Sequence, residues 1–370
     1  MLRFGEMMWR ELSKLGHDVR LLAPRAVLFP EVWRKDAGWK WVGYINKFLL
    51  FPLLLRREAR SADVIHICDH SNAMYIPWLR GLPNVITVHD LIAIRAARGI
   101  EAPEPIGWTG RIFQRLILSG LSQTQRAICV SDNTRSQLLE LVPALHARSF
   151  VVHSGQNFDF YPVGTGECDA VRRRFGLGLE PYFLHVGQNH HRKNRTYLFQ
   201  LLAALIAHRP ALPNRLVLVG SPLSPGEVSV INACGVAGRI SALGKVDGDD
   251  LRALYSGAQA MIFPSLLEGF GWPIIEAQAC GCPVITSDRP PMNDIGGDAA
   301  IYIDPLDHRS GAEKIIAALS SLAGRREASL RNASRFTTER MMGEYLFAYR
   351  AAREAMGRGS MREARLEFWQ

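Results

Sequence analysis

The sequence predicts an α/β protein made of two doubly wound domains, each with a parallel sheet crossed by helices. Three observations lead to this prediction. The chain has 370 residues, which is long enough for two ordinary domains. Short β-branched runs alternate with amphipathic helical patterns through both halves, as is typical of parallel sheets. A polar, glycine-containing stretch at residues 155–181 separates the two sets of runs.

The first domain is expected over residues 1–160. It opens with an amphipathic helix from Arg3 to Leu15, and five strand-like runs follow: HDVRLLAP, ADVIHICD, NVITVHD, RAICVS and SFVVHSG. A strand and a glycine turn normally precede such a first helix. Neither is found before it here, so the first strand of this domain is expected to be missing.

The second domain is expected over residues 161–335. Its strand-like runs are YFLHVG, RLVLVG, RISALG, AQAMIFPS, CPVITSD and AAIYIDP. A last helical pattern over 336–357 is long enough to leave this domain and return to the first one. The tail after Gly357 is expected to fray.

Composition and charge limit the functional classes. The formal net charge is +9, and most of the excess lies in residues 1–150, which favours an acidic partner or a membrane surface for the first domain. We find no zinc-finger spacing, no homeodomain-like helix and no arginine-rich arm. Nucleic acid is therefore not expected as a partner.

Cysteine usage and the N-terminal segment indicate a cytoplasmic protein. The six cysteines are scattered, and the one close pair is C-G-C rather than C-x-x-C, so free thiols are expected. The opening segment MLRFGEMMWRELSKLGHDVRLLAP is polar at helical intervals and lacks the apolar core of a signal peptide.

The most apolar stretch is YINKFLLFPLLLRREAR, residues 44–60. Its uncharged part between Lys47 and Arg56 is too short to span a bilayer. Together with Trp33, Trp39 and Trp41 and the neighbouring cations, it could contact an anionic membrane surface from one side. A buried helix followed by a polar loop is the alternative.

The segment LLEGFGWPIIEAQACGCPVITSD, residues 266–288, is the first candidate site. It places Glu268 and Glu276 eight positions apart across a glycine turn. Residues 259–265 are strand-like, and Pro273 suits the first position of the following helix. Glu268 is thus expected at the exit of the strand, and Glu276 about one turn into the helix.

The backbone of this turn favours hydroxyls or negative charge. The amides of Gly269, Phe270 and Gly271, with the open helix N-terminus, are expected to face the ligand. Each of the two carboxylates can accept hydrogens from a pair of hydroxyls. The segment therefore predicts a hydroxyl-rich ligand held at both ends, such as one with a sugar ring and a ribose diol. An ordinary turn before an acidic helix start is the alternative.

A second candidate site lies in GQNHHRKN, residues 187–194. A strand is expected to end at Gly187 and a helix to begin near Arg195, with Arg192 and Lys193 in the loop between them. Two cations at a helix N-terminus form an anion site that would fit a diphosphate. A solvated basic turn is the alternative, and the two adjacent histidines lack the spacing of metal ligands.

A third candidate is His89, which with Asp90 follows the strand-like run NVITV. A single histidine is more often structural. Its place at the carboxyl end of a parallel strand favours a role in ligand binding.

Together these residues resemble the retaining glycosyltransferases of the GT-B fold, family four. The resemblance runs from about residue 10 to residue 350. Its specific part is the second half, where GQNHHRKN, RLVLVG, the E-x7-E element and GGDAAIYIDPLD follow the order and spacing of the family.

The resemblance implies a nucleotide-diphosphate sugar donor bound mainly by the second domain and an acceptor bound mainly by the first. Arg192 and Lys193 would hold the diphosphate and stabilise it as the leaving group, in place of a metal. Glu276 would accept the ribose hydroxyls, Glu268 with the amides after it would hold the transferred sugar, and His89 would lie near the other edge of that sugar.

Two further details follow from the resemblance. The segment of Lys245 and Val246 would lie near the base of the donor. The D-x-D metal clamp of another class of sugar-transferring enzyme is matched by Asp247 and Asp249, but a helix N-cap at Asp249 or Asp250 explains the pattern without a metal. No metal and no cofactor are therefore expected.

The leading hypothesis is a retaining, metal-independent glycosyltransferase. It would move a hexose, with mannose as the candidate, to a glycan or lipid-linked glycan acceptor in surface polysaccharide synthesis. We expect it in the cytoplasm, in peripheral contact with the inner face of the membrane. A catalytically silent sugar-nucleotide binding protein of the same fold is the alternative. A nicotinamide-dependent oxidoreductase is disfavoured because no G-x-G-x-x-G follows a strand.

Overall fold

The chain forms two compact units in the computed structural model, which describes residues 2–23, 45–100, 106–209, 215–357 and 365–369. Unit 1 comprises Met1–His153 and Glu339–Gln370, and unit 2 comprises Ser154–Thr338. The domain boundaries expected from the sequence, at residues 160 and 335, compare with 153 and 338 here.

Unit 1 contains a six-stranded parallel sheet in the order β1-β12-β2-β3-β4-β5. The strands are β1 (Asp18–Leu22), β2 (Val64–Ile67), β3 (Asn84–Val88), β4 (Arg126–Cys129), β5 (Ser149–Val151) and β12 (Arg365–Trp369). The α-helices are α1 (Leu2–Lys14), α3 (Phe51–Glu58), α4 (Ile92–Ala97), α5 (Trp108–Ser122), α6 (Asp132–Leu141) and α15 (Thr338–Glu354). Shorter helical segments are η2 (Asn46–Leu50), η3 (Ala59–Ser61), η4 (His70–Leu79) and η5 (Pro143–Arg148).

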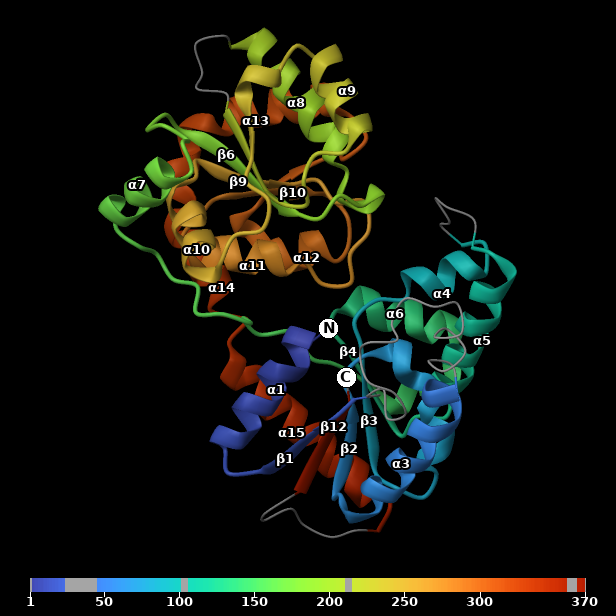
Figure 1. Ribbon diagram of the computed structural model, residues 1–370. Coiled ribbons are helices and arrows are strands. Elements are labelled where there is room, and N and C mark those ends of the chain that lie inside the picture. The colour runs from blue at the N-terminus through green and yellow to red at the C-terminus, as the bar shows by residue number, and fades with distance from the viewer. Residues whose placement is uncertain (1, 24–44, 101–105, 210–214, 358–364, 370) are drawn as a thin grey trace, which may run out of the picture. The chain divides into compact units, whose positions relative to one another are not determined.

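Helices cover both faces of this sheet (Figure 1). On one face, α3, η4 and α5 pack on the β2 side chains Ile65 and Ile67 in a continuous apolar core. On the other face lie α1 and α15, and Phe4 of α1 contacts the ring of Tyr345 of α15. The apolar residues that repeat along α1 are buried, as its amphipathic pattern predicts.

A buried polar chain fixes α15 on the sheet. The ring of His66, on β2, bonds Thr87 of β3 through Nε2 over 2.8 Å and the Tyr349 hydroxyl through Nδ1 over 2.9 Å. Thr87 also bonds the hydroxyl of Tyr345 over 2.9 Å. Burial, and then the nearby His89, lower the pKa of His66 to about 3, so the ring is neutral at pH 7. Each bond needs its partner in one position, so α15 has one register on this face.

The strand β12 lies between the edge strand β1 and β2 and pairs with both of them (Figure 1). Asp18 of β1 pairs with Arg365 and Val64 of β2 pairs with Leu366, both in parallel register. The prediction of a frayed tail after Gly357 was therefore wrong for residues 365–369. Since β1 and β2 do not pair with each other, β12 satisfies backbone groups of both strands.

Unit 2 contains a second six-stranded parallel sheet, in the order β11-β10-β9-β6-β7-β8. Its strands are β6 (Tyr182–Gly187), β7 (Arg215–Gly220), β8 (Ile240–Ala242), β9 (Ala260–Phe263), β10 (Val284–Ser287) and β11 (Ile301–Ile303). Its α-helices are α7 (Thr165–Arg174), α8 (Arg195–His208), α9 (Pro225–Ala233), α10 (Gly248–Gly257), α11 (Trp272–Ala279), α12 (Met292–Gly296), α13 (His308–Leu322) and α14 (Arg326–Ala333). Short 3-10 segments are η6 (His191–Lys193), η7 (Ala237–Arg239), η8 (Gly297–Ala299) and η9 (Ala323–Arg325).

The order of strands in unit 2 reverses between β6 and β9. Helices α8, α9 and α13 cover one face of the sheet, and α10, α11 and α12 cover the other (Figure 1). Ligands of doubly wound sheets bind at such a reversal, outside the carboxyl ends of the strands. The segments after β6 and β9 contain the first two candidate sites, and the Leu266 amide donates to the Arg192 carbonyl over 2.7 Å. The fold therefore brings these two segments together.

Each strand-like run predicted from the sequence corresponds to a strand, so the prediction of two doubly wound domains is confirmed. All six cysteines are unpaired thiols. Within the described ranges, no helix combines the length and the hydropathy needed to cross a bilayer.

We expect the sheet of unit 1 to depend on the backbone of β12. Replacing Glu367 with proline removes an amide from a strand that is paired on both sides, where an unpaired partner costs about 1 to 3 kcal/mol. Hydrogen exchange should then speed up in β1, β2 and α1, with unit 2 unchanged. Glu367→Ala, which keeps the amide, is the control. Equal exchange in the two variants would contradict the role of β12.

Candidate active site

The loops of unit 2 leave the sheet after unusually close backbone packing. Gly220, at the end of β7, has a φ of +131°, and a Cβ there would lie 2.2 Å from the carbonyl oxygen of Gly187. The Gly220 amide donates to the carbonyl of Gly244, just after β8, over 2.8 Å. Only glycine fits at Gly220, and its small size lets the three strand ends approach each other.

Asn194 fixes the end of the loop that follows β6. Its backbone is left-handed, with a φ of +55°, a conformation in which asparagine is enriched among residues other than glycine. Its side-chain Nδ2 donates to the carbonyls of Pro264 over 3.2 Å and Pro305 over 2.8 Å. The loop is thus tied to the segments after β9 and β11, which restricts where Arg192 and Lys193 can lie.

Glu268 joins the two cations of this loop. Its Oε2 accepts from Arg192 Nη1 over 2.7 Å, and its Oε1 accepts from Lys193 Nζ over 2.6 Å. The side chains of Glu268 and Lys193 are 8% and 11% exposed, whereas Arg192 is 30% exposed. The residues that the sequence assigned to two separate candidate sites therefore form a single charge cluster.

Within this cluster one carboxylate faces two cations, and the Glu276 carboxylate also acts on Lys193 from nearby. Burial lowers the pKa of Lys193, while the nearby Glu268 carboxylate opposes that shift. The ammonium also lies 4.7 Å from the centre of the Phe263 ring, a position that favours the charged form. Arg192 retains exposed guanidinium surface. An anion such as a phosphate would be attracted by the two cations. It would displace little water, because the cluster is mostly buried.

The turn after Glu268 leads into α11 through a backbone conformation that favours glycine. Gly271, with a φ of +111°, is the N-cap residue, and α11 begins at Trp272 with Pro273 in its first turn. The sequence indicated Pro273 as the first helical residue. In the structure it is the second. The side chain of Phe270 is buried against Phe336, with ring centres 5.8 Å apart. The side chain of Phe270 is therefore covered and does not contact a ligand.

Glu276 is the fifth of the eight residues of α11, about one turn into the helix, and is buried, with 8% of its surface exposed. Its Oε2 accepts from the Tyr255 hydroxyl over 3.0 Å. Burial and the adjacent Glu276 carboxylate raise the pKa of Tyr255 well above its usual range, which keeps the phenol protonated as a donor. Tyr255 thus orients the carboxylate, a partner that the spacing of the glutamates alone did not reveal.

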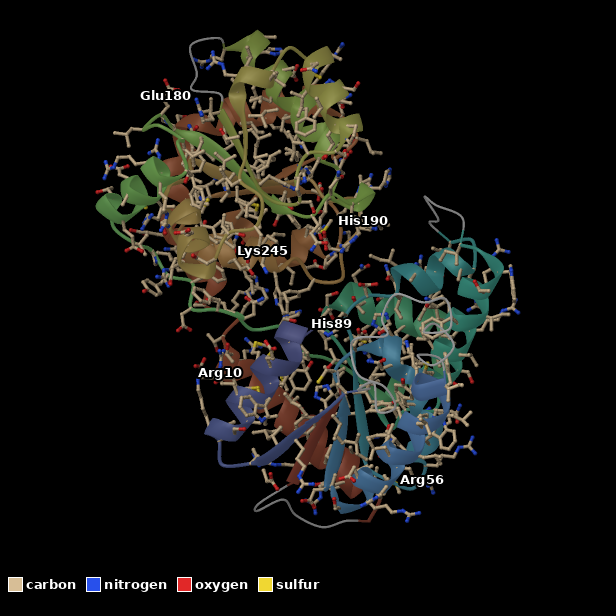
Figure 2. The ribbon with its side chains drawn as sticks, viewed as in Figure 1. Arg10, Arg56, His89, Glu180, His190 and Lys245 are labelled. Atoms are coloured by element: carbon tan, nitrogen blue, oxygen red, sulfur yellow. The ribbon has the colours of Figure 1, made fainter. Side chains whose placement is uncertain are left out.

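The segment after β8, which contains Lys245 and Val246, is less buried than the segment after β9. Lys245 is exposed and Val246 is half-buried. The Gly244 carbonyl anchors the segment to β7. Figure 2 labels Lys245 and His190, both on loops at the carboxyl ends of unit 2 strands.

The D-x-D pattern is taken up by helix capping and ion pairing. Asp247 Oδ1 accepts from the Asp250 amide over 2.8 Å, so Asp247 is the N-cap of α10, not Asp249 or Asp250 as expected. Asp249 pairs with Arg252 over 2.7 Å, and Asp250 pairs with Arg174. The described residues contain no group of three or more His, Cys, Asp or Glu side chains that could hold a metal ion.

His89 lies at the carboxyl end of β3 in unit 1, beside the first turn of α1 (Figure 2). Its Nε2 donates to the carbonyl of Cys68 over 2.8 Å, and the ring of Phe4 contacts it edge-on at 4.8 Å. Burial lowers the pKa of His89 to about 4, and the charge of His70 contributes. The ring is therefore neutral at pH 7, with Nδ1 as a hydrogen-bond acceptor.

Comparisons with known proteins agree with this geometry. A family model described as Glycosyltransferase Family 4 matches residues 6–160, and one described as Glycosyl transferases group 1 matches residues 180–321. A D-inositol 3-phosphate glycosyltransferase of Actinosynnema mirum is 30% identical over 81% of this chain and 76% of its own length. This chain belongs to glycosyltransferase family 4. An O-antigen chain mannosyltransferase B of Escherichia coli is 28% identical over 82% of this chain and 78% of its own length.

Solved structures show that this glycosyltransferase has the GT-B fold. The sucrose-phosphate synthase of Thermosynechococcus elongatus superposes with a TM-score of 0.73 at 19% identity, over 94% of this chain and 92% of that chain. HepE of Anabaena, solved in complex with UDP-glucose, superposes with a TM-score of 0.70 at 17% identity, over 94% and 95% of the two chains. The fold predicted from the sequence is confirmed.

The glycosyltransferase has a further network that the sequence analysis missed. Arg195, the first residue of α8, forms an ion pair with Glu227 of α9 over 2.9 Å, and their side chains are 3% and 7% exposed. Glu227 also accepts from Asn189, in the loop before Arg192, over 2.7 Å. The pattern Ser224-Pro-Gly-Glu227 predicts a capping box, and that box is present. Its link to the loop could not be read from the sequence.

Neutralising Glu227 should destabilise unit 2. In Glu227→Gln the buried guanidinium of Arg195 loses its counter-charge, which commonly costs about 3 to 5 kcal/mol. Chemical denaturation measures the loss, and Glu313→Gln, on the exposed face of α13, is the matched control.

The double variant Arg195→Met/Glu227→Met should recover much of that stability, because it removes both charges together. If Glu227→Gln were no less stable than Glu313→Gln, the ion pair would have no role in holding the loop.

Proposed function

We propose that this glycosyltransferase is a retaining, metal-independent hexosyltransferase that uses a nucleotide-diphosphate sugar. The cluster of Arg192, Lys193 and Glu268 carries the proposal, because it offers two adjacent cations where strand order reverses in unit 2. A diphosphate has the charge and the oxygen spacing to be held by an arginine fork and a lysine ammonium.

The other residues have roles in donor binding under this proposal. Glu276, oriented by Tyr255, accepts the ribose hydroxyls, and the segment of Lys245 and Val246 lies near the base. Glu268 and the amides of residues 269–271 accept and donate bonds to the transferred sugar. A carboxylate offers about four lone-pair sites, so Glu268 can bond a hydroxyl while it holds both cations.

The transfer step breaks the bond between the anomeric carbon and the diphosphate oxygen and forms a bond from that carbon to an acceptor hydroxyl oxygen. The acceptor approaches on the face that the diphosphate leaves, so the configuration is retained. The hydroxyl proton passes to the departing phosphate. Arg192 and Lys193 stabilise the charge that develops on that phosphate. Neutral His89 accepts a hydrogen bond from the sugar through Nδ1.

The acceptor is proposed to be a glycan or lipid-linked glycan in surface polysaccharide synthesis, with mannose as the candidate sugar. The similarity to an O-antigen chain mannosyltransferase supports both points. A catalytically silent sugar-nucleotide binding protein is the second candidate, and activity separates the two.

Replacing Lys193 with alanine should lower kcat for sugar transfer by about 100-fold or more, because one well-placed charge donor is commonly worth about 3 to 4 kcal/mol of barrier. Lys314→Ala, on the exposed face of α13, is the matched control and should keep full activity. Transfer is measured with a panel of nucleotide sugars in EDTA, and NMR of the product reads the anomeric configuration.

Glu268→Ala should also lose transfer, while thermal shift still reports binding of the nucleoside diphosphate. Background rates in the wild-type protein equal to those of both variants would support the silent candidate. An inverted product or a requirement for metal would overturn the proposed mechanism.

Contact with the inner face of the membrane is proposed for the surface of η2 and α3. Phe48, Leu49, Leu53 and Leu54 of this helical stretch are exposed, with Leu49 at 62% and Leu53 at 56%. The opposite side, formed by Phe51, Pro52 and Leu55, is buried. Arg57 is 83% exposed beside these residues. An apolar helix face bordered by cations fits an anionic bilayer. The tryptophans Trp33, Trp39 and Trp41, also predicted to contribute, lie outside the described residues.

Vesicles of phosphatidylcholine and phosphatidylglycerol should sediment the protein, and high salt should weaken the association by screening. Leu49→Ser/Leu53→Ser should lose most of this binding without loss of fold, since both side chains are exposed. Leu179→Ser, at a position 59% exposed in unit 2, is the control. Absence of salt-sensitive sedimentation of the wild-type protein would remove the membrane proposal.

A further inference from the structure

A pocket of about 370 Å³ lies in unit 1. The end of α4 and one side of α5 form its walls. Its lining includes Ile94, Ala97, Arg98, Arg111, Arg115 and Leu118. Three guanidinium groups therefore surround a cavity that also has an apolar surface.

These three arginines are not neutralised within the described part of the chain. None of Arg98, Arg111 and Arg115 forms an ion pair there, and Arg111 donates through Nε to the carbonyl of Ile106 over 3.1 Å. In contrast, Arg95 on α4 is buried and pairs with Glu140. Three unpaired cations around one cavity repel each other, and an anion that enters removes the repulsion.

The next row of side chains on α5 is apolar and exposed. Trp108, Ile112 and Leu116 repeat at helical spacing beside the arginines and are 75%, 47% and 47% exposed. One residue further along the helix, Phe113 contacts Phe48 of η2, with ring centres 6.4 Å apart. The exposed apolar row on α5 is thus connected to the exposed apolar surface of η2 and α3.

The position of the pocket relates it to His89. Helix α4 begins directly after the His89–Asp90 segment, and Asp90 Oδ1 accepts from the Ile92 amide at its start. The six residues of α4 span about 9 Å, so the pocket lies about one or two sugar rings from the carboxyl end of β3. A ligand held in the pocket could therefore present a glycan toward His89.

We propose that this pocket binds the phosphate or diphosphate head group of an amphiphile that carries the acceptor glycan, while the apolar row of α5 contacts its hydrocarbon chain. The arginine forks match the oxygens of a phosphate, and the adjacent apolar row favours a phosphate that belongs to a lipid-like molecule. The inference rests on the proposed function and specifies the class of its acceptor.

Isothermal titration with farnesyl phosphate tests the proposal, with farnesol and inorganic phosphate as separate arms. We expect farnesyl phosphate to bind at least ten-fold more tightly than either. Arg111→Gln/Arg115→Gln should weaken binding of farnesyl phosphate at least ten-fold. Both side chains are exposed, so the fold, checked by circular dichroism, should persist. Arg98→Gln alone is a second variant with the same expected direction, and Arg173→Gln, exposed on α7, is the matched control.

Three outcomes would overturn the pocket assignment: no binding of farnesyl phosphate, equal binding of farnesol or inorganic phosphate, and equal affinity in the arginine variants. The donor site is read separately by the thermal shift with nucleoside diphosphates, which these variants should leave unchanged. If farnesyl phosphate binds as expected but no nucleotide sugar supports transfer, the proposed function fails while the binding site stands.

Discussion

The pairing of Glu268 with both Arg192 and Lys193 is the interaction on which the arrangement of unit 2 depends. It joins the exits of β6 and β9, the two strands between which the order reverses. Two adjacent cations in a site with little water would otherwise repel each other and require hydration. The backbone bond from Leu266 to Arg192 and the side-chain bonds of Asn194 hold the same two segments together. The charge cluster is therefore rigid, which favours preorganised binding of an anion.

In unit 1 two histidine side chains on or beside the strands are neutral, in contrast to the charged cluster of unit 2. His66 and His89 are both neutral, because burial lowers the pKa of each ring. A neutral ring does not attract anions, whereas Arg98, Arg111 and Arg115 line a pocket at the end of α4 and along α5. Uncharged recognition near the strand ends and charged recognition further out would suit a ligand whose reacting end is a sugar and whose other end is anionic.

The sequence predicted the strands well because each is a short β-branched run bounded by glycine, proline or polar residues, and burial on both faces leaves little freedom for other structures. It also predicted that β6 ends at Gly187 and that Glu268 lies in the turn between a strand and a helix, although β9 ends at Phe263, earlier than expected. It did not predict that Glu268 bonds the cations of the other loop, because pairing between distant loops depends on strand order, which local patterns do not encode.

The same limit explains the residues that were missed or misassigned. Tyr255 and Glu227 reach their partners across helices, and neither has a local signal for that contact. The N-cap of α10 fell on Asp247 because three nearby aspartates each suit that position, and only the start of the helix decides among them. The segment 365–369 has no glycine or turn pattern that marks a strand, and its structure depends on two neighbours far away in sequence.

The position of β12 also affects the order in which the protein can fold. All of unit 2 lies in sequence between β2 and β12, whereas the strands of unit 2 come from one continuous segment. During synthesis, unit 2 can complete its sheet before β12 is available to pair with β1 and β2. Loop closure over such a distance is entropically costly and slow. The edges of β1 and β2 stay unpaired during that interval and can pair with strands of other chains. A chaperone that covers these edges would therefore protect unit 1 more than unit 2.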